Sequence, residues 1–417
     1  MLFKYLKKMF LKGKILKEYQ AINKLQQKRQ FVEAVKAAEK IIEKSPRKQR
    51  PYHMILHMCL FGLKDLDKFD YWYSRYITDS KGSHRALYSL MKKRVSGDML
   101  GWHNDITKLR GKLTNPNRAR NEFLLLKVLE VFPLEEILTK VDHLFEQSNV
   151  IHDEVGVLEE VKKALKQKEG FYYTRMSDGE GSLIAAYENY TADTTINNQV
   201  YQRMNKLMFR QKKLTKADLD YIMPPLKNAF VNASLLSIPP ASRIKSTLKG
   251  VWRGYLGVAS CIHFLYEHSR LSSPPALVAH HLKTRIETPE FLNQILALHT
   301  DIGLITCHEN LADRFKEMGA QSVKVHLIPN QPNSYHGHNS LKGQRLYPDR
   351  DQQILREIRQ GGRQRIYFVA AGVLAKNYCY ELAKAGHIAF DLGSAIDAWM
   401  GIAARGQSND YIKKLTL

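Results

Sequence analysis

The chain has 417 residues, of which 64 are Lys or Arg and 41 are Asp or Glu, so its formal net charge is +23. A hydrophobic fraction of 44% at this length predicts two or three folded domains and excludes a largely disordered chain. Four widely separated cysteines argue against a disulfide framework and indicate a reducing compartment. The positive charge predicts attraction to polyanions such as anionic lipid, nucleic acid or phosphorylated substrates.

Residues 1–17 form a basic amphipathic segment. Its apolar side chains recur at helical spacing and lysines fill much of the remaining surface; the apolar positions are Leu2, Phe3, Leu6, Met9, Phe10 and Leu16. Such a helix either lies in an anionic membrane interface or packs its apolar stripe into a protein core, and the pattern fits both interpretations. The chain shows no nucleic-acid-binding signature, so we do not expect nucleic acid as a partner.

No apolar run in the sequence is long enough to cross a membrane, and the first residues lack the pattern of a secretory signal. We therefore expect a cytoplasmic protein. If residues 1–17 bind lipid, the protein lies peripherally at the inner face of the cell membrane.

Residues 18–165 have helical periodicity almost throughout, which predicts an all-α domain. The predicted helices span 30–44, 52–63, 66–77, 83–95, 122–146 and 151–168. Phe31 and Phe69 open two similar stretches. A helix-pair repeat of the tetratricopeptide kind is one interpretation, and ordinary bundle packing is the other.

From residue 166 to residue 417, short apolar runs alternate with helical stretches. The runs that predict strands are 171–176, 277–279, 302–307, 323–328, 366–370 and 388–391. This alternation is typical of an α/β domain with a Rossmann-like, mainly parallel sheet and helices on both faces. Residues 329–348 are predicted to form a long loop at the edge of the sheet, and such loops are often functional.

The strand predicted at 171–176 leads directly into an acidic turn, Ser177-Asp178-Gly179-Glu180, and then into a helical stretch. Two carboxylates that flank a residue without a side chain can converge on one divalent cation. The cation can hold a diphosphate, which Arg175 can help to neutralise. Ligands of open α/β sheets bind at such positions. The alternative interpretation is an ordinary turn that caps the next helix.

A second cluster follows the last two predicted strands. The turn at Gly372 either lets the backbone approach a phosphate at a helix N-terminus or is simply a tight junction. Asp391 ends the final predicted strand, and Asp397 follows shortly after. An aspartate at such a position can bind sugar hydroxyls or act as a base, although Asp391 with Ser394 could equally cap a helix.

The histidine pairs at 280–281 and 336–338 have no partners at a recognisable zinc spacing, so we interpret them as solvated side chains. Glu309, directly after Cys307-His308, is interpreted as a favourable charge at the start of a helix.

Two stretches together resemble a known family. Arg175-x-x-Asp178-Gly179-Glu180, followed by Ser182-Leu-Ile, resembles the Asp-x-Glu region of the GT-D-type bacterial glycosyltransferases. The segments 370–376 and 390–399 resemble the end of the same domain, so the resemblance covers roughly residues 170–402. Many relatives have glycine at the position of Ser177, and some have histidine at the position of Ser394.

The resemblance implies a Rossmann-like domain that binds a nucleotide-sugar, typically a UDP-sugar, and acts on bacterial surface glycans or glycoproteins. It also implies Mn²⁺ or Mg²⁺ at Asp178 and Glu180, with Arg175 beside the diphosphate. The adjacent Ser177 and Gly179, together with Gly372, are the other positions expected to contact the cofactor.

The sequence therefore predicts a basic segment (1–17), a helical domain (18–165) and a GT-D-like glycosyltransferase domain (166–417). We expect an enzyme of the hexosyltransferase type that moves sugar from a UDP-sugar to a surface-glycan or lipid-linked acceptor. Asp391 is the first candidate for the catalytic base and Asp397 is the second. Two other functions stay open: a non-catalytic helical scaffold that binds polyanions, and a metal-dependent phosphohydrolase that uses the same carboxylates.

Overall fold

The computed structural model describes residues 18–26, 28–44, 49–79, 85–109, 120–207, 209, 214–279, 281–330, 339–341, 343–402 and 409–417. The predicted basic segment 1–17, residue 280 and the histidines at 336–338 lie outside these residues. Within them, none of the helices is both long enough and apolar enough to cross a bilayer. The chain forms two compact units, Met1–Leu126 with Ser246–Trp252 and Lys127–Lys245 with Arg253–Leu417, called unit 1 and unit 2 below.

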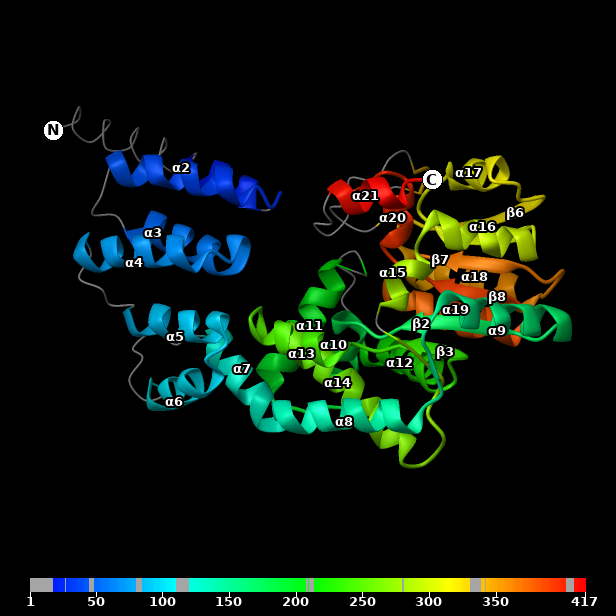
Figure 1. Cartoon of the computed structure of the whole chain (residues 1–417), viewed down its shortest axis with the longest axis horizontal. Helices are drawn as coiled ribbons and strands as arrows, with labels where there is room; N and C mark the ends of the chain where they lie inside the picture. Colours follow the sequence, from blue (N-terminus) through cyan, green and yellow to red (C-terminus); the bar gives the residue numbers. More distant parts are fainter. Residues whose placement is uncertain are drawn as a thin grey trace. The chain divides into compact units, whose positions relative to one another are not determined.

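Unit 1 is helical in its described part, and successive helices pack against one another. The elements are α2 (Phe31–Lys44), α3 (Gln49–His57), η1 (Met58–Leu63), α4 (Leu66–Asp79), α5 (Arg85–Ser96), α6 (Met99–Leu109) and the start of α7 (Arg120–Val131). Figure 1 shows α2, then α3 with α4, then α5 with α6 as successive layers. Buried aromatic side chains from α3 and α4, among them Tyr52, Phe69 and Trp72, form much of the core. The structure thus bears out the four helices predicted between residues 30 and 95 but does not identify a tetratricopeptide repeat.

A buried ion pair ties the segment Ser246–Trp252 to the helices of unit 1. Arg94 donates two hydrogen bonds of 2.8 Å to the carboxylate of Glu122, and the indole of Trp102 donates a third to the same carboxylate. The remaining guanidinium nitrogen of Arg94 donates to the carbonyl oxygens of Leu248 and Gly250, both at 2.5 Å. Because every charged atom has a partner, the hydrogen bonds and the attraction between the charges can offset the desolvation cost of burying this pair.

Unit 2 is an α/β domain, as predicted. In the described residues it has one sheet of eight strands, in the order β1-β4-β3-β2-β8-β7-β5-β6, and every pairing is parallel. The strands are β1 (Val150–Ile151), β2 (Phe171–Arg175), β3 (Leu235–Ser237), β4 (Leu277–Val278), β5 (Asp301–Thr306), β6 (Ser322–Leu327), β7 (Ile366–Val369) and β8 (Ile388–Asp391). The six predicted strands are all present, whereas β1 and β3 were not predicted.

Helices precede, connect and follow these strands. They are α8 (Leu134–Gln147), α9 (Glu154–Gln167), α10 (Asp178–Tyr187), α11 (Thr194–Leu207), α12 (Lys216–Val231), α13 (Ala241–Leu248), α14 (Trp252–Ser269), α15 (Leu282–Ile286), α16 (Pro289–Leu298), α17 (Leu311–Glu317), η2 (Leu346–Arg350), α18 (Asp351–Arg359), η3 (Gly372–Leu374), α19 (Ala375–Lys384), α20 (Ala395–Trp399) and α21 (Asn409–Leu415). Because consecutive parallel strands cannot be joined by a hairpin, helical crossovers of this kind are required.

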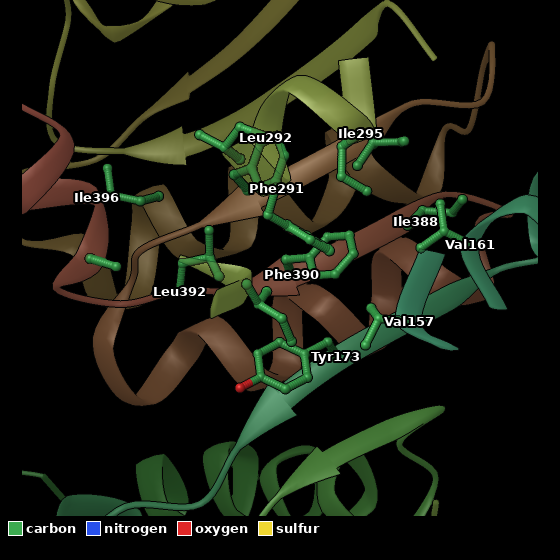
Figure 2. Packing of buried hydrophobic residues seen from close by; sticks show 14 of the residues in the cluster. Val157, Val161, Tyr173, Phe291, Leu292, Ile295, Ile388, Phe390, Leu392 and Ile396 are labelled. Atoms are coloured by element: carbon green, nitrogen blue, oxygen red, sulfur yellow. The ribbon is translucent and has the colours of Figure 1, made fainter. Parts of the chain in front are cut away.

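Helices cover both faces of the sheet. On one face the side chains of β2 and β8 pack against α9, α16 and α20, and Figure 2 shows Phe390 between Phe291 and Tyr173. On the other face Tyr172 packs against Tyr380 of α19 and donates a hydrogen bond to a carbonyl oxygen of α12. Side chains alternate between faces along a strand, so a sheet buried on both sides needs the nearly continuous apolar runs that the sequence contains.

Candidate functional site

The carboxyl ends of β2 and β8 form the centre of the candidate site. These strands are neighbours in the sheet, yet the segments that follow them lie on opposite faces. After β2 the chain enters α10, which contacts α12 on the face covered by α19. After β8 it enters α20, whose Trp399 packs against Phe368 and Phe315 on the other face. Open α/β sheets bind ligands in a crevice outside the strand ends at such a divergence, and we therefore expect the ligand-binding crevice here.

A network of buried charged groups lies beneath this crevice. The Lys376 ammonium, at the start of α19, lies 2.8 Å from Glu180 Oε1 and 2.8 Å from Asp391 Oδ2. Arg175, the last residue of β2, donates a hydrogen bond of 2.9 Å to Glu287 and lies 3.9 Å from Asp391 Oδ1. The structure therefore brings together two predicted site residues from the first motif, Arg175 and Glu180, and one from the second, Asp391.

The network keeps its members charged. Burial alone would raise the pKa of the Glu180 and Asp391 carboxyls. The positive charge of Lys376 outweighs burial at both sites and lowers each pKa, and Arg175 contributes to this effect at Asp391. Burial would lower the pKa of Lys376, and the two carboxylates reverse this effect and raise it. At neutral pH the two acids are therefore ionised and the amine is protonated.

Two atoms of the network lack a hydrogen-bond partner. Asp391 Oδ1 and Arg175 Nε are buried and have no hydrogen-bond partner among the described residues. Unsatisfied buried polar atoms are uncommon in folded proteins, and when they occur together they often mark a site where a ligand or water completes the network.

The two carboxylates of the Asp-x-Glu motif lie in different environments. Asp178, the first residue of α10, is exposed, whereas Glu180 is only 4% exposed. One oxygen of Glu180 is bonded to Lys376, and the other accepts a hydrogen bond from the Ser177 hydroxyl. Asp178 is thus available to a solvated cation as it stands, while Glu180 would have to exchange a protein partner for a metal ion.

Close backbone packing fixes the acidic turn against α14. A Cβ atom on Gly181 would lie 1.8 Å from the carbonyl oxygen of Gly257, and one on Gly257 would lie 2.0 Å from the carbonyl oxygen of Asp178. Ser182 donates a hydrogen bond of 2.6 Å to the same Asp178 oxygen. Only glycine permits the two helices to approach this closely. The position of Asp178 therefore depends on glycine at 181 and 257.

The turn after β8 also needs glycine. Gly393 has a φ of +53°, and a Cβ atom on it would lie 2.4 Å from a guanidinium nitrogen of Arg175. Among the remaining predicted contacts, Ser177 and Gly179 are partly exposed in the turn before and within α10. Gly372 begins η3, between β7 and α19, and is partly exposed as well. These three residues are partly exposed, whereas Glu180, Lys376 and Asp391 of the charged network are buried.

Sequence analysis missed several charged members of this region. Lys376 and Glu287 complete the buried network, and the Tyr411 hydroxyl donates a hydrogen bond of 2.7 Å to Glu287. Two arginines on helices that pack against α10, Arg203 of α11 and Arg253 of α14, were also missed. The pKa of Arg253 is lowered by burial and by the nearby Arg203. No local spacing in the sequence links these residues, because each comes from a different segment and only the folded topology brings them together.

Asp397, the second candidate base, lies in a separate cluster. Its carboxylate is 2.8 Å from Nε2 of His308, which follows β5. Burial lowers the pKa of His308, but hydrogen bonds to Asp397 and Cys307 outweigh burial and raise the pKa to about 9. The His308 imidazole is therefore protonated at neutral pH, and sequence analysis did not predict this pair.

Comparison with protein-family models, curated proteins and solved structures finds no match for this chain.

Proposed function

We propose that unit 2 is a glycosyltransferase that moves a sugar from a UDP-sugar to a bacterial surface-glycan or lipid-linked acceptor. The observation that carries this proposal is the charged network at the diverging ends of β2 and β8, where Arg175, Glu180 and Asp391 from the two motifs meet. Both segments that resemble the GT-D-type transferases contribute to this one crevice. A chance likeness of two short motifs would not require them to be neighbours in the fold.

The donor diphosphate would bind at the amino end of α10. Backbone N–H groups at a helix start favour an anion, and the cationic side chains of Arg203 and Arg253 lie on neighbouring helices. A Cβ atom on Gly179 would lie 3.5 Å from the methyl group of Met204, the residue after Arg203, so α11 passes close to this glycine. A diphosphate above Gly179 would therefore be close to both helices.

A divalent cation fits this site in part. Asp178 offers an exposed carboxylate, whereas both oxygens of Glu180 already have protein partners. In this proposal Asp178 holds the Mn²⁺ or Mg²⁺, and Glu180 positions Lys376 and, through it, Asp391. The cation would supply charge that stabilises the diphosphate as it leaves.

The residues of the chain itself would perform the remaining steps. An acceptor hydroxyl donates its proton to a carboxylate, its oxygen attacks the anomeric carbon, and the bond between that carbon and the diphosphate oxygen breaks with its electron pair on the diphosphate. Asp391 is the proposed base because it is ionised and its Oδ1 has no hydrogen-bond donor among the described residues. Since Asp391 is only 1% exposed, the turn at Gly393 would have to move to admit the acceptor.

Product analysis tests this proposal against the two alternatives. The full chain is incubated with a panel of UDP-sugars, Mn²⁺ and bacterial membrane glycolipids, and UDP, free phosphate and labelled glycolipid are measured. The transferase predicts that UDP and labelled glycolipid appear together and that Asp391→Asn abolishes both. Free phosphate without sugar transfer would support a phosphohydrolase, and no turnover of any donor by the folded chain would favour the scaffold.

A further inference from the structure

A second group of ligand-type side chains lies in unit 2, apart from the network around Lys376. In the described part of the chain, one set of three His, Cys, Asp or Glu residues has potential ligand atoms that all lie within 4.8 Å of one another: Cys307, His308 and Asp397. Cys307 and His308 directly follow β5, and Asp397 lies on α20 after β8. The cluster therefore joins the carboxyl ends of two strands that are separated by β7.

The fold holds each of these residues in place. The carbonyl oxygen of Cys307 accepts a hydrogen bond of 2.6 Å from the Asn339 side chain, and the His308 backbone N–H donates to Thr306 Oγ1. The helix that carries Asp397 is anchored by Trp399, which is fully buried and donates a hydrogen bond to the Glu287 carbonyl oxygen. Ligands supported in this way lose little freedom when they bind an ion.

The chemistry of the three side chains matches one class of ion. Thiolate, imidazole and carboxylate together suit Zn²⁺ and similar borderline ions, whereas Mg²⁺ and Ca²⁺ prefer oxygen alone. Ligand atoms around tetrahedral zinc are roughly 3.3–3.7 Å apart. The widest pair here would therefore have to close by up to about 1 Å, and His308 Nε2 and Asp397 Oδ1, now 2.8 Å apart, would have to separate slightly. His308 is buried, but Cys307 and Asp397 are partly exposed, which gives an ion a route from solvent.

We propose that Cys307, His308 and Asp397 bind a zinc-type transition-metal ion, with a fourth position open to water or substrate. This site is distinct from the cation site proposed at Asp178. When the ion enters, the Cys307 thiol and the His308 imidazolium each release a proton to solvent, and the hydrogen bond between His308 and Asp397 is exchanged for bonds to the metal. Three protein ligands with one open position are typical of catalytic rather than structural zinc sites.

Cobalt substitution tests the site directly. The full chain, stripped of metal with EDTA and kept reduced, is titrated with Co²⁺ and followed by absorption spectroscopy. Thiolate coordination predicts a near-ultraviolet charge-transfer band with visible bands of four-coordinate cobalt, and added Zn²⁺ should remove both. Cobalt held by the carboxylates of Asp178 and Glu180 alone cannot produce the charge-transfer band. Because the Cys261 thiol lies beside the turn that carries them, loss of the band in Cys307→Ser is what excludes a contribution from Cys261.

Three variants make the result specific. Cys307→Ser should abolish the charge-transfer band, and Asp397→Asn should weaken Co²⁺ binding by at least about tenfold. Cys59→Ser, a matched change of a free cysteine in unit 1, should leave the spectrum unchanged. The proposal is overturned if the folded wild-type chain gives no charge-transfer band, or if the band survives Cys307→Ser.

Discussion

The ammonium of Lys376 lies 2.8 Å from the carboxylate of Glu180 and holds that carboxylate in the interior of unit 2. The same ammonium is 2.8 Å from Asp391, so one lysine joins the acidic turn after β2 to the end of β8. An Asp-x-Glu sequence alone suggests two equivalent acidic ligands. The structure instead gives one exposed carboxylate, Asp178, and one that is part of a buried ion network.

Removal of Lys376 should strongly destabilise unit 2. Lys376→Met leaves Glu180 and Asp391 buried without their main cation, and we expect a loss of about 3–5 kcal/mol in the free energy of unfolding. Lys216→Met is the matched control, because Lys216 pairs with Asp220 on an exposed helix surface and its loss should have no measurable effect. Urea unfolding followed by circular dichroism measures both. Equal stabilities of the two variants would show that the network does not hold these carboxylates.

The packing of α10 on α14 gives a second pair of variants. Gly181→Ala places a methyl group 1.8 Å from the Gly257 carbonyl oxygen, so the two helices must separate, at a cost of about 3 kcal/mol or more. Among the described residues, Gly179→Ala, two residues earlier in the same helix, meets only the methyl group of Met204, at 3.5 Å. Its stability should be unchanged or slightly higher, since alanine favours helix. Thermal unfolding that ranks the two variants in the opposite order would contradict this packing.

The turn after β8 should affect activity more than stability. Gly393→Ala brings a methyl group to 2.4 Å from Arg175 and displaces the guanidinium that lies between Glu287 and Asp391. Gly401→Ala has a similar backbone cost, because its φ is +72°, but no atom of the described residues lies closer than 3.9 Å to the added methyl group. We expect UDP release from a donor sugar to fall about tenfold or more in Gly393→Ala only. Equal activities of Gly393→Ala and Gly401→Ala would contradict a role for Arg175 in the reaction.

Asp351 should make stability depend on pH in a defined direction. Burial raises its pKa to about 6, although the Tyr378 hydroxyl and Arg359 oppose this shift. The pKa of this carboxyl is higher in the folded chain than in the unfolded chain, where it is near 3.8. Such a group contributes its full stabilisation below the unfolded pKa, and the contribution is lost as the pH rises through the folded pKa, about 6.

Asp351→Asn keeps an acceptor for Tyr378 and removes the titration. Between pH 5 and pH 8 the wild type should therefore lose about 1 kcal/mol more unfolding free energy than the variant. Urea unfolding at both pH values measures this difference. The same pH dependence in the two proteins would place the pKa of Asp351 outside this range.

Most of the architecture could be predicted from the sequence, because strong local patterns specify it. All six predicted strands are present, and their alternation with helices identifies a parallel sheet. The strand β3 was missed because it is a run of three residues, Leu235–Ser237, with no pattern long enough to show a period. Similarly, the helix predicted at 122–146 is two helices, since Pro133 interrupts it between α7 and α8.

The site was only partly predictable. Arg175 and Asp391 end apolar runs, so their location at strand ends followed from the sequence. Lys376 and Glu287 were not predicted, because each is an ordinary charged residue in its own segment and gains its partners only from strand order. The same holds for His308 and Asp397, which are 89 residues apart in the chain and 2.8 Å apart in the fold.

Calorimetric titration of UDP into the full chain, with and without Mn²⁺, tests the central claim most directly. The measurement compares wild type with Asp178→Asn, which should fold normally because Asp178 is exposed, and with Asp220→Asn, an acidic surface residue outside the crevice. We predict Mn²⁺-dependent UDP binding that Asp178→Asn weakens at least about tenfold and Asp220→Asn leaves unchanged. Absence of binding by UDP, GDP and CMP alike, or UDP binding that is insensitive to Asp178→Asn, would contradict a nucleotide-sugar site in this crevice.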